Sequence, residues 1–168
     1  NFSSKANVFI PILNYNNNKS KFNVALDLIN SEKFYELKKF SFEEGKNRVA
    51  VDNFKLNKNF KIISLKNLHV ETFYNDKANN QFKVNIGKKI NIIGSKYDAT
   101  NLLDLLDGSV EKQSVLKGLS KEIKISIDDL QNPYNPINKF NLIGKLIDGS
   151  FTKISSKGEF EDGKYLDI

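Results

Sequence analysis

The sequence has no cysteine, no methionine and a single histidine in 168 residues, and each absence excludes a kind of chemistry. Without cysteine the chain forms no disulfide bond, no thiolate zinc site and no cysteine nucleophile. A catalytic triad, a zinc site and a histidine-based acid–base pair all need partners that this composition does not contain. The one histidine, His69, lies within an alternating segment, where a surface or packing role is expected. The sequence therefore predicts no catalytic residue, no metal site and no cofactor, and we expect the chain not to be an enzyme.

Long apolar runs are also missing. No stretch approaches the roughly 18 consecutive apolar residues of a membrane-spanning helix, and no signal peptide pattern is present. Because the chain begins at Asn1 and contains no methionine, we expect a segment of a longer protein, with any membrane anchor or targeting signal outside it. With 39% hydrophobic and 27% charged residues, we expect residues 1–168 to form one folded, soluble segment.

Arginine is almost absent, although the formal net charge is +6. Arg48 is the only arginine, and the lysines are spread along the chain rather than clustered in the sequence. Proteins that read nucleic acids usually use arginine for bidentate contacts to phosphate and guanine. We therefore expect no nucleic-acid partner.

What the sequence does contain is alternation of apolar and polar residues with a period of two, which is typical of strands with one buried face. Short turns between the alternating segments, such as 45–47, 57–59, 148–149 and 162–163, predict antiparallel neighbours. The pattern predicts a mostly-β fold, an antiparallel meander that forms a curved, groove-like sheet, with a β-sandwich as the alternative. The alternating segments are 21–29, 39–43, 48–56, 60–64, 68–73, 82–86, 90–92 and 123–128, followed by three short strands within 138–168.

Two segments depart from this alternation. In residues 98–107, Asp98 can cap a helix, and the leucines that follow have helical spacing up to Gly108. This predicts one short inserted helix, with Leu102, Leu103 and Leu106 packing against the sheet. Residues 131–137 contain Pro133 and Pro136, and they are predicted to form a loop because proline cannot donate to a strand ladder.

The apolar side of the predicted strands must be covered, either by a closed core or by an apolar ligand in a groove. Periodicity does not separate these two uses, because both need the same side chains. The candidate lipid-binding face is one parity of the clearest strands. Its residues are Val24, Leu26, Leu28, Val49, Val51, Phe60, Ile62, Val70, Val84, Ile86, Ile123, Ile125 and Ile127.

The segment NIIGSKYDATNLLDLLDG resembles a signature of AsmA-like proteins, particularly the long YhdP-type members that are related to TamB. In that signature a strand ends in glycine, here Gly94, and an aromatic-Asp-Ala triplet, here 97–99, precedes a leucine-rich helix. The run FSFEEGKNRVAVDNFKL, the strand KIISLKNLHVETF and the tail GKLIDGSFTKISSKGEFEDGKYLDI are similar to the meander and hairpins of the same family. The resemblance covers residues 20–168.

The resemblance implies a non-catalytic, periplasmic protein that is anchored in the inner membrane by a helix outside this chain. Such proteins shield phospholipid or other acyl chains in an apolar β-groove, for transport between the inner and outer membranes or for outer-membrane biogenesis. Two other readings stay open on the residues alone: a β-sandwich adhesion module that binds protein or glycan, and a small-ligand enzyme on a β scaffold.

Overall fold

The computed structural model describes residues 2–5, 8–10, 15–17, 21–100, 118–132 and 134–168, with side chains from Asp27 onward within those ranges. These residues contain thirteen strands and no helix. The strands are β1 (Phe2–Lys5), β2 (Val8–Ile10), β3 (Tyr15–Asn17), β4 (Lys21–Asn30), β5 (Phe34–Glu44), β6 (Asn47–Asn57), β7 (Ile62–Tyr74), β8 (Lys77–Ile86), β9 (Ile90–Asp98), β10 (Glu122–Gln131), β11 (Ile137–Ile147), β12 (Ser150–Phe160) and β13 (Tyr165–Asp167).

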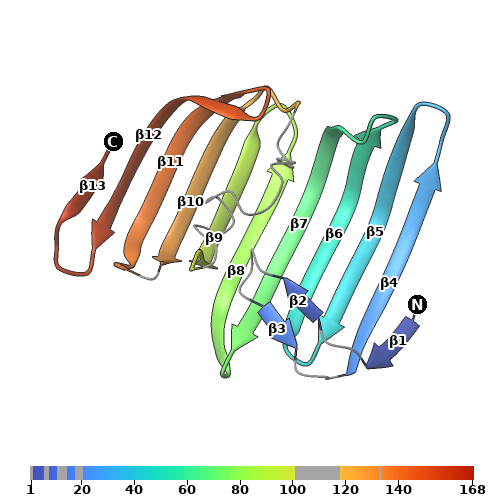
Figure 1. Ribbon diagram of the computed structural model, residues 1–168, viewed down its shortest axis with the longest axis horizontal. Coiled ribbons are helices and arrows are strands. Elements are labelled where there is room, and N and C mark those ends of the chain that lie inside the picture. The colour runs from blue at the N-terminus through green and yellow to red at the C-terminus, as the bar shows by residue number, and fades with distance from the viewer. Residues whose placement is uncertain (1, 6–7, 11–14, 18–20, 101–117, 133) are drawn as a thin grey trace.

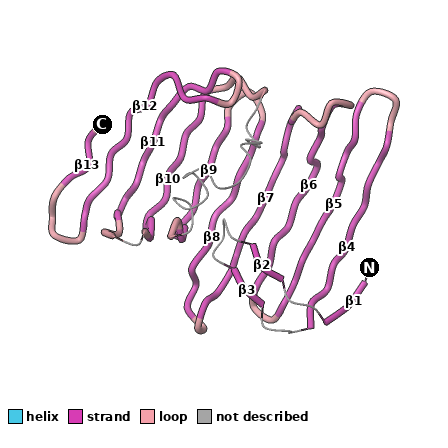
Figure 2. The backbone as a smooth tube through the Cα atoms, viewed as in Figure 1, coloured by secondary structure: helices cyan, strands magenta, loops and turns pink. Residues whose placement is uncertain are grey.

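Eleven of these strands form one open, curved sheet in the order β1-β4-β5-β6-β7-β8-β9-β10-β11-β12-β13 (Figure 1). The other two, β2 and β3, form a hairpin that lies against β7. Strands account for most of the traced backbone, and short turns join nearly all of them (Figure 2). The predicted mostly-β, curved sheet is confirmed. The described strands do not form the two stacked sheets of the alternative sandwich.

The described sheet departs from a strict antiparallel meander where β1 pairs with β4, past the β2–β3 hairpin, and where β9 and β10 run parallel. A parallel pair needs a crossover connection that returns the chain to the starting end of the first strand, and β9 ends at Asp98 whereas β10 begins at Glu122. The helix predicted for residues 98–107 falls at the beginning of the segment between them. Asp98 is the last residue of β9, and its Oδ1 accepts a hydrogen bond from the Thr100 N–H at 3.1 Å. Residues 101–107 lie outside the described residues.

The predicted loop at 131–137 corresponds to the segment between β10, which ends at Gln131, and β11, which begins at Ile137. The Asn132 side chain organises it by accepting hydrogen bonds from the Tyr134 and Asn135 N–H groups at 2.9 and 3.0 Å. An asparagine that bonds to the backbone two and three residues ahead stabilises a turn.

Two lines of irregularity cross the sheet and keep its apolar side chains on one face. In each strand that such a line crosses, the two apolar residues on either side of the line are three positions apart in the sequence instead of two. One extra residue is thus inserted between these apolar residues. Because strand side chains alternate between the two faces, this insertion keeps the apolar residues on both sides of the line on the same face. Asn53 and Lys139, one on each line, have φ of 48° and 53°. The three-residue steps are Leu37/Phe40, Val51/Phe54 and Leu65/Leu68 in β5–β7, and Gly94/Tyr97, Ile127/Leu130 and Ile137/Phe140 in β9–β11.

Gly94 is required by the close approach of β8 and β9. A Cβ at this position would lie 2.5 Å from the Phe82 Cβ and 2.7 Å from its Cα. Overpacking of this kind forces a backbone shift, so Gly94→Ala is expected to lower the free energy of unfolding by about 1–3 kcal/mol. Gly87→Ala is the control, because the nearest atom is the Asn85 Oδ1 at 3.6 Å. Urea denaturation that finds both variants equally stable would contradict this account of Gly94.

A buried polar cluster ties the hairpin of β7 and β8 to the end of β9. The Thr72 hydroxyl donates to the Asn79 Oδ1 and accepts from the Asn80 Nδ2, both at 2.8 Å. The Asn80 Oδ1 accepts the Asp98 N–H at 3.0 Å. Thr72 and Asn80 are 1% and 0% exposed, so water cannot replace these partners. The cluster therefore fixes the point where the chain leaves β9 for the crossover.

Thr72→Val tests this cluster, because it keeps the side-chain shape and removes the hydroxyl. Leaving the two asparagine groups without that partner is expected to cost about 1–3 kcal/mol of unfolding free energy. The control is Thr152→Val, since Thr152 is exposed and its hydroxyl donates only to the Lys145 carbonyl at 3.2 Å. Thermal and urea unfolding should separate the two variants, and an unchanged midpoint for Thr72→Val would refute the stabilising role of the cluster.

Candidate functional site

The apolar face of the sheet is organised in three rows that cross the strands, because cross-strand partners in register share a face. The first, the Val70 row, runs over Phe42, Val49, Val70, Phe82, Gly94 and Ile127. The second, the central row, runs over Phe40, Val51, Leu68, Val84, Ile92, Ile125 and Leu142. The third, the Ile86 row, runs over Phe54, Leu65, Ile86, Ile90, Ile123 and Gly144.

The outer two rows contain the buried core. In the Val70 row, Phe42, Val70, Phe82 and Ile127 form one buried cluster, and Val70 and Ile127 are only 1% and 2% exposed. The Ile86 row contributes to a second buried cluster. Leu119, just before β10, packs in this second cluster and is 2% exposed. Most side chains of the outer rows are therefore buried and stabilise the fold, while Val49 and Phe54 are partly buried and pack against the two clusters.

The central row differs from both. Each of its seven side chains is partly exposed, and none is fully buried. Leu68, Val84, Ile92 and Ile125 pack against both clusters, so the row lies between them as a continuous apolar stripe. Over the six strand spacings from β5 to β11 the stripe is about 29 Å long.

The hairpin of β2 and β3 covers part of the apolar face near β7 (Figure 1). On β7, Val70 and Thr72 are 1% exposed, whereas the side chains of His69 and Glu71 on the opposite face are 30% and 36% exposed. Because the hairpin contacts β7 but leaves His69 and Glu71 accessible to solvent, it lies on the apolar face of the sheet, over Val70 and Thr72. The hairpin thus closes one flank of the apolar face.

The structure brings together most of the predicted site residues, but it divides them among the rows. The central row receives Val51, Val84 and Ile125, whereas Val49, Val70 and Ile127 belong to the Val70 row and Ile86 and Ile123 to the Ile86 row. Ile62 packs against the second cluster. Val24 and Leu26 stand in register with Phe42 and Phe40, although their side chains lie outside those described. Leu28 pairs with Leu37 near the edge of the sheet and is 59% exposed.

The prediction that Phe60 begins a strand is wrong. Phe60 does not begin a strand, because β7 starts at Ile62 and Phe60 occupies the preceding turn with φ of 57°. Its ring is 70% exposed and stacks on Tyr35 at a centroid distance of 5.2 Å. The Asn57 side chain forms this turn by accepting the Asn59 and Lys61 N–H groups. Alternation alone did not reveal that the turn extends through Phe60.

Sequence reasoning left out four residues of the central row, namely Phe40, Leu68, Ile92 and Leu142. Each lies in a segment that the alternation identified as a strand. The signal that would have selected them is register, since each pairs with a neighbour in the same row.

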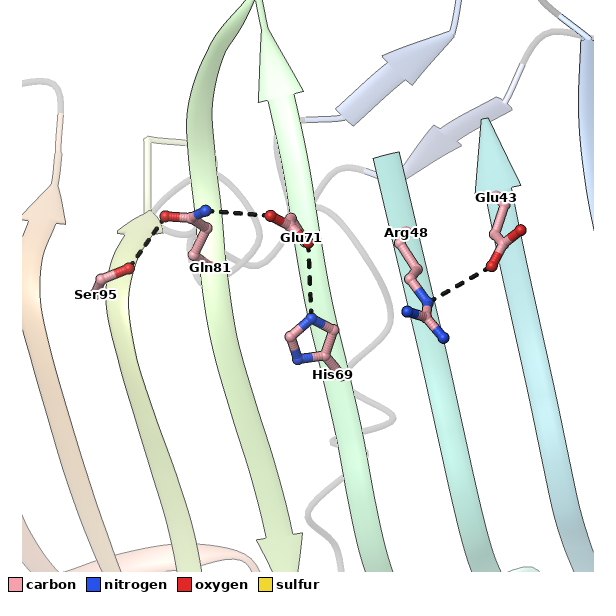
Figure 3. Close-up of polar contacts among 6 residues, drawn as sticks. All are labelled: Glu43, Arg48, His69, Glu71, Gln81 and Ser95. Carbon is pink, nitrogen blue, oxygen red and sulfur yellow. Dashed lines mark hydrogen bonds and ion pairs between the residues drawn. The ribbon is translucent and has the colours of Figure 1, made fainter. Parts of the chain in front are cut away.

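The opposite face of the described strands is mostly polar, and the contacts drawn in Figure 3 do not pair a nucleophile with a base. The Ser95 hydroxyl donates to the Gln81 Oε1 at 3.2 Å, and the Gln81 Nε2 donates to the Glu71 Oε1 at 3.3 Å. The His69 Nε2 lies 3.9 Å from the Glu71 Oε2. A nucleophile needs a base as its hydrogen-bond acceptor, and here the serine donates to an amide. Arg48 and Glu43 form a separate ion pair, with the Nε 3.6 Å from the Oε1.

Metal and small-ligand sites are not prominent elsewhere in the part of the chain that the structure describes. No three histidine or acidic side chains gather there as a candidate metal site. A cavity of about 320 Å³ lies between β11, β12 and β13, and it is lined by the ion-paired Lys139 and Glu159. None of the predicted site residues lines it. Among the described residues, no helix has the length and apolar character needed to cross a membrane.

Comparisons of the chain with protein families, with curated proteins and with solved structures gave no match.

Proposed function

We propose that this chain is a non-catalytic segment of an AsmA-like envelope protein that shields lipid acyl chains on the apolar face of its sheet. The central row is the floor of the groove, and the two buried clusters are its walls. The segment belongs to a periplasmic protein held in the inner membrane by a part outside this chain. Its ligand is a phospholipid or another acyl-chain lipid.

The observation that carries the proposal is the partial exposure of an unbroken apolar row between two mostly buried ones. A residue row that served only as core would be closed at its centre first, because side chains in the middle of a packed layer have the most neighbours. Here every side chain of the central row is partly exposed, whereas most residues of the flanking rows are buried, with Val49, Gly94 and Phe54 as the partly exposed exceptions. An extended exposed apolar patch on a folded chain usually marks a binding site.

The dimensions of the stripe suit an acyl tail. Two tails laid end to end make up the ~30 Å hydrocarbon thickness of a bilayer, so a stripe of about 29 Å accommodates a whole tail. Each CH₂ group that the stripe keeps from water contributes about 0.8 kcal/mol. A row without polar interruption also lets a tail slide along it. The sheet as a whole, with ten strand spacings, is about 48 Å wide, so the segment can hold lipid but does not bridge two membranes.

The proposal is tested first by native mass spectrometry of the purified chain, with organic extraction of the bound material. Phospholipid in stoichiometric amount is the expected result. A chain that is lipid-free and binds no added phospholipid would overturn the proposal, and the apolar face would then be a closed core, as the adhesion-module reading requires.

Photo-crosslinking gives a second test. A photoreactive residue at Val84 or Ile92, in the central row, is expected to label the lipid that stays bound to the purified chain when no membrane is present. The matched controls are Lys83 and Asn91, which precede these residues in β8 and β9 and point to the other face. Equal lipid labelling from both faces would argue against a groove on the apolar side.

A further inference from the structure

The polar face of β8–β12 carries a group of lysines. These lysines lie opposite the apolar face and have no part in the proposed binding of acyl chains. Register and alternation place them on one face: Lys83 is opposite Ile93, Lys124 is opposite Ile143, and Lys145 is opposite Lys153. Lys83, Lys124, Lys145 and Lys153, here called the lysine face, are all exposed. Among the described residues, none of the four forms an ion pair with a carboxylate.

The acidic residues around the lysine face leave most of its charge uncompensated. Glu122 stands opposite Lys145, but its Oε2 lies 2.6 Å from the Lys89 Nζ. The hydrogen bond and charge of Lys89 hold the pKa of Glu122 below its ordinary value, and Lys145 adds a smaller contribution. Asp129 is paired with Lys96 at 2.9 Å. Asp128 is the one remaining carboxylate of β10, so the lysines outnumber the acids available to them.

Two large apolar side chains stand exposed among these lysines. Ile93, beside Lys83, is 59% exposed, and Ile143, beside Lys124, is 63% exposed. Single exposed apolar residues are ordinary on a protein surface. Lysines around exposed apolar side chains, however, are typical of surfaces that bind at a membrane interface, where the cations meet lipid headgroups and the apolar groups enter the boundary with the tails.

We infer that the lysine face docks on the surface of an anionic phospholipid bilayer. Charge complementarity selects this partner, and Ile93 and Ile143 supply the apolar contact that a purely ionic partner would not need. A nucleic acid fits less well, because Arg48 is the only arginine and lies on β6, outside this group. The docking goes beyond the proposed function, since it uses the opposite side of the sheet and does not require a bound tail.

Vesicle co-sedimentation of the purified chain tests the inference. Binding is expected to vesicles that contain phosphatidylglycerol and not to vesicles of phosphatidylcholine alone, and it should weaken as salt rises because exposed charges are screened. The triple change Lys124→Gln, Lys145→Gln and Lys153→Gln should weaken binding by about fivefold for each lysine, roughly a hundredfold in all. Ile143→Ser, at an exposed position, should weaken it without lowering stability.

The matched control changes three other exposed lysines, Lys33, Lys38 and Lys77, to glutamine, which gives the same change in net charge. Little loss of vesicle binding is expected. Equal weakening by both triple variants would show attraction by net charge alone and overturn the inference. An equally tight complex with a DNA oligonucleotide would also overturn it. Lipid extraction from the triple variant distinguishes this inference from the proposed function. The variant is expected to keep its bound acyl-chain lipid although it no longer binds vesicles.

Discussion

Replacing Val51 and Ile125 by aspartate is expected to remove the phospholipid that travels with the chain. Both residues lie in the central row, on β6 and β10, and both are partly exposed. When an acyl tail binds over the row, a carboxylate at either position would be desolvated without gaining a hydrogen-bond or ion-pair partner. This desolvation is expected to make lipid binding less favourable by at least a few kcal/mol. Since each 1.4 kcal/mol changes affinity about tenfold, bound lipid should fall about a hundredfold or more. Native mass spectrometry after extraction measures the loss.

The matched controls place the same charge on the other face of the same strands. These controls are Ala50→Asp and Ser126→Asp. Ala50 is next to Val51 in β6 and Ser126 is next to Ile125 in β10, and the side chains of Ala50 and Ser126 point to the polar face. These variants should keep their lipid. Circular dichroism must show that all four variants retain the sheet. If the central-row aspartates unfold the chain and the unchanged chain carries no lipid, the row is ordinary core and the proposed function fails.

Shortening Ile127 to alanine is expected to have the largest effect on stability. Ile127 is 2% exposed and belongs to the buried cluster that also contains Phe42, Val70 and Phe82. Removing its buried carbons and leaving a cavity should lower the free energy of unfolding by about 2–5 kcal/mol. Urea denaturation measures this change. The control is Ile63→Ala, because Ile63 is 45% exposed and its loss should stay within about 1 kcal/mol.

These two predictions distinguish residues that form the core from residues that contact lipid, which the sequence pattern did not distinguish. The Ile127 change should reduce stability while the remaining folded chain keeps its lipid, and the central-row aspartates should do the reverse. If Ile127→Ala removed lipid from a chain that stays folded, the division between buried wall and open floor would be wrong.

Several features of the fold could be predicted from the sequence because they depend on local chemistry. The alternation in residues 82–86 and 123–128 predicted strands, since a period of two matches the pleat. The two prolines in 131–137 excluded a ladder and predicted the loop. The turn at 57–59 was also predicted, but its end was misplaced, because the Asn57 side chain extends the turn to Lys61 and takes Phe60 out of the strand.

The candidate site was only partly predictable, because a row across the sheet is built from strands far apart in the chain. Leu68 and Leu142 share the central row only through the pairings of the strands between them. The three-residue steps at the two irregular lines also break the period of two. A strict alternation would have placed Leu37 and Phe40 on opposite faces, whereas their partners Phe54 and Val51 place them together.

The order of residue types along the chain was enough to predict that this protein is mostly strand and that its strands have one apolar side. The three-dimensional structure was needed to show that β9 and β10 run parallel, that the described strands make one open sheet, and that the central row stays partly exposed while most of its flanking residues are buried. The physical reason is that burial depends on what covers a face, and the covering groups, the β2–β3 hairpin and Leu119, reach it from distant parts of the chain.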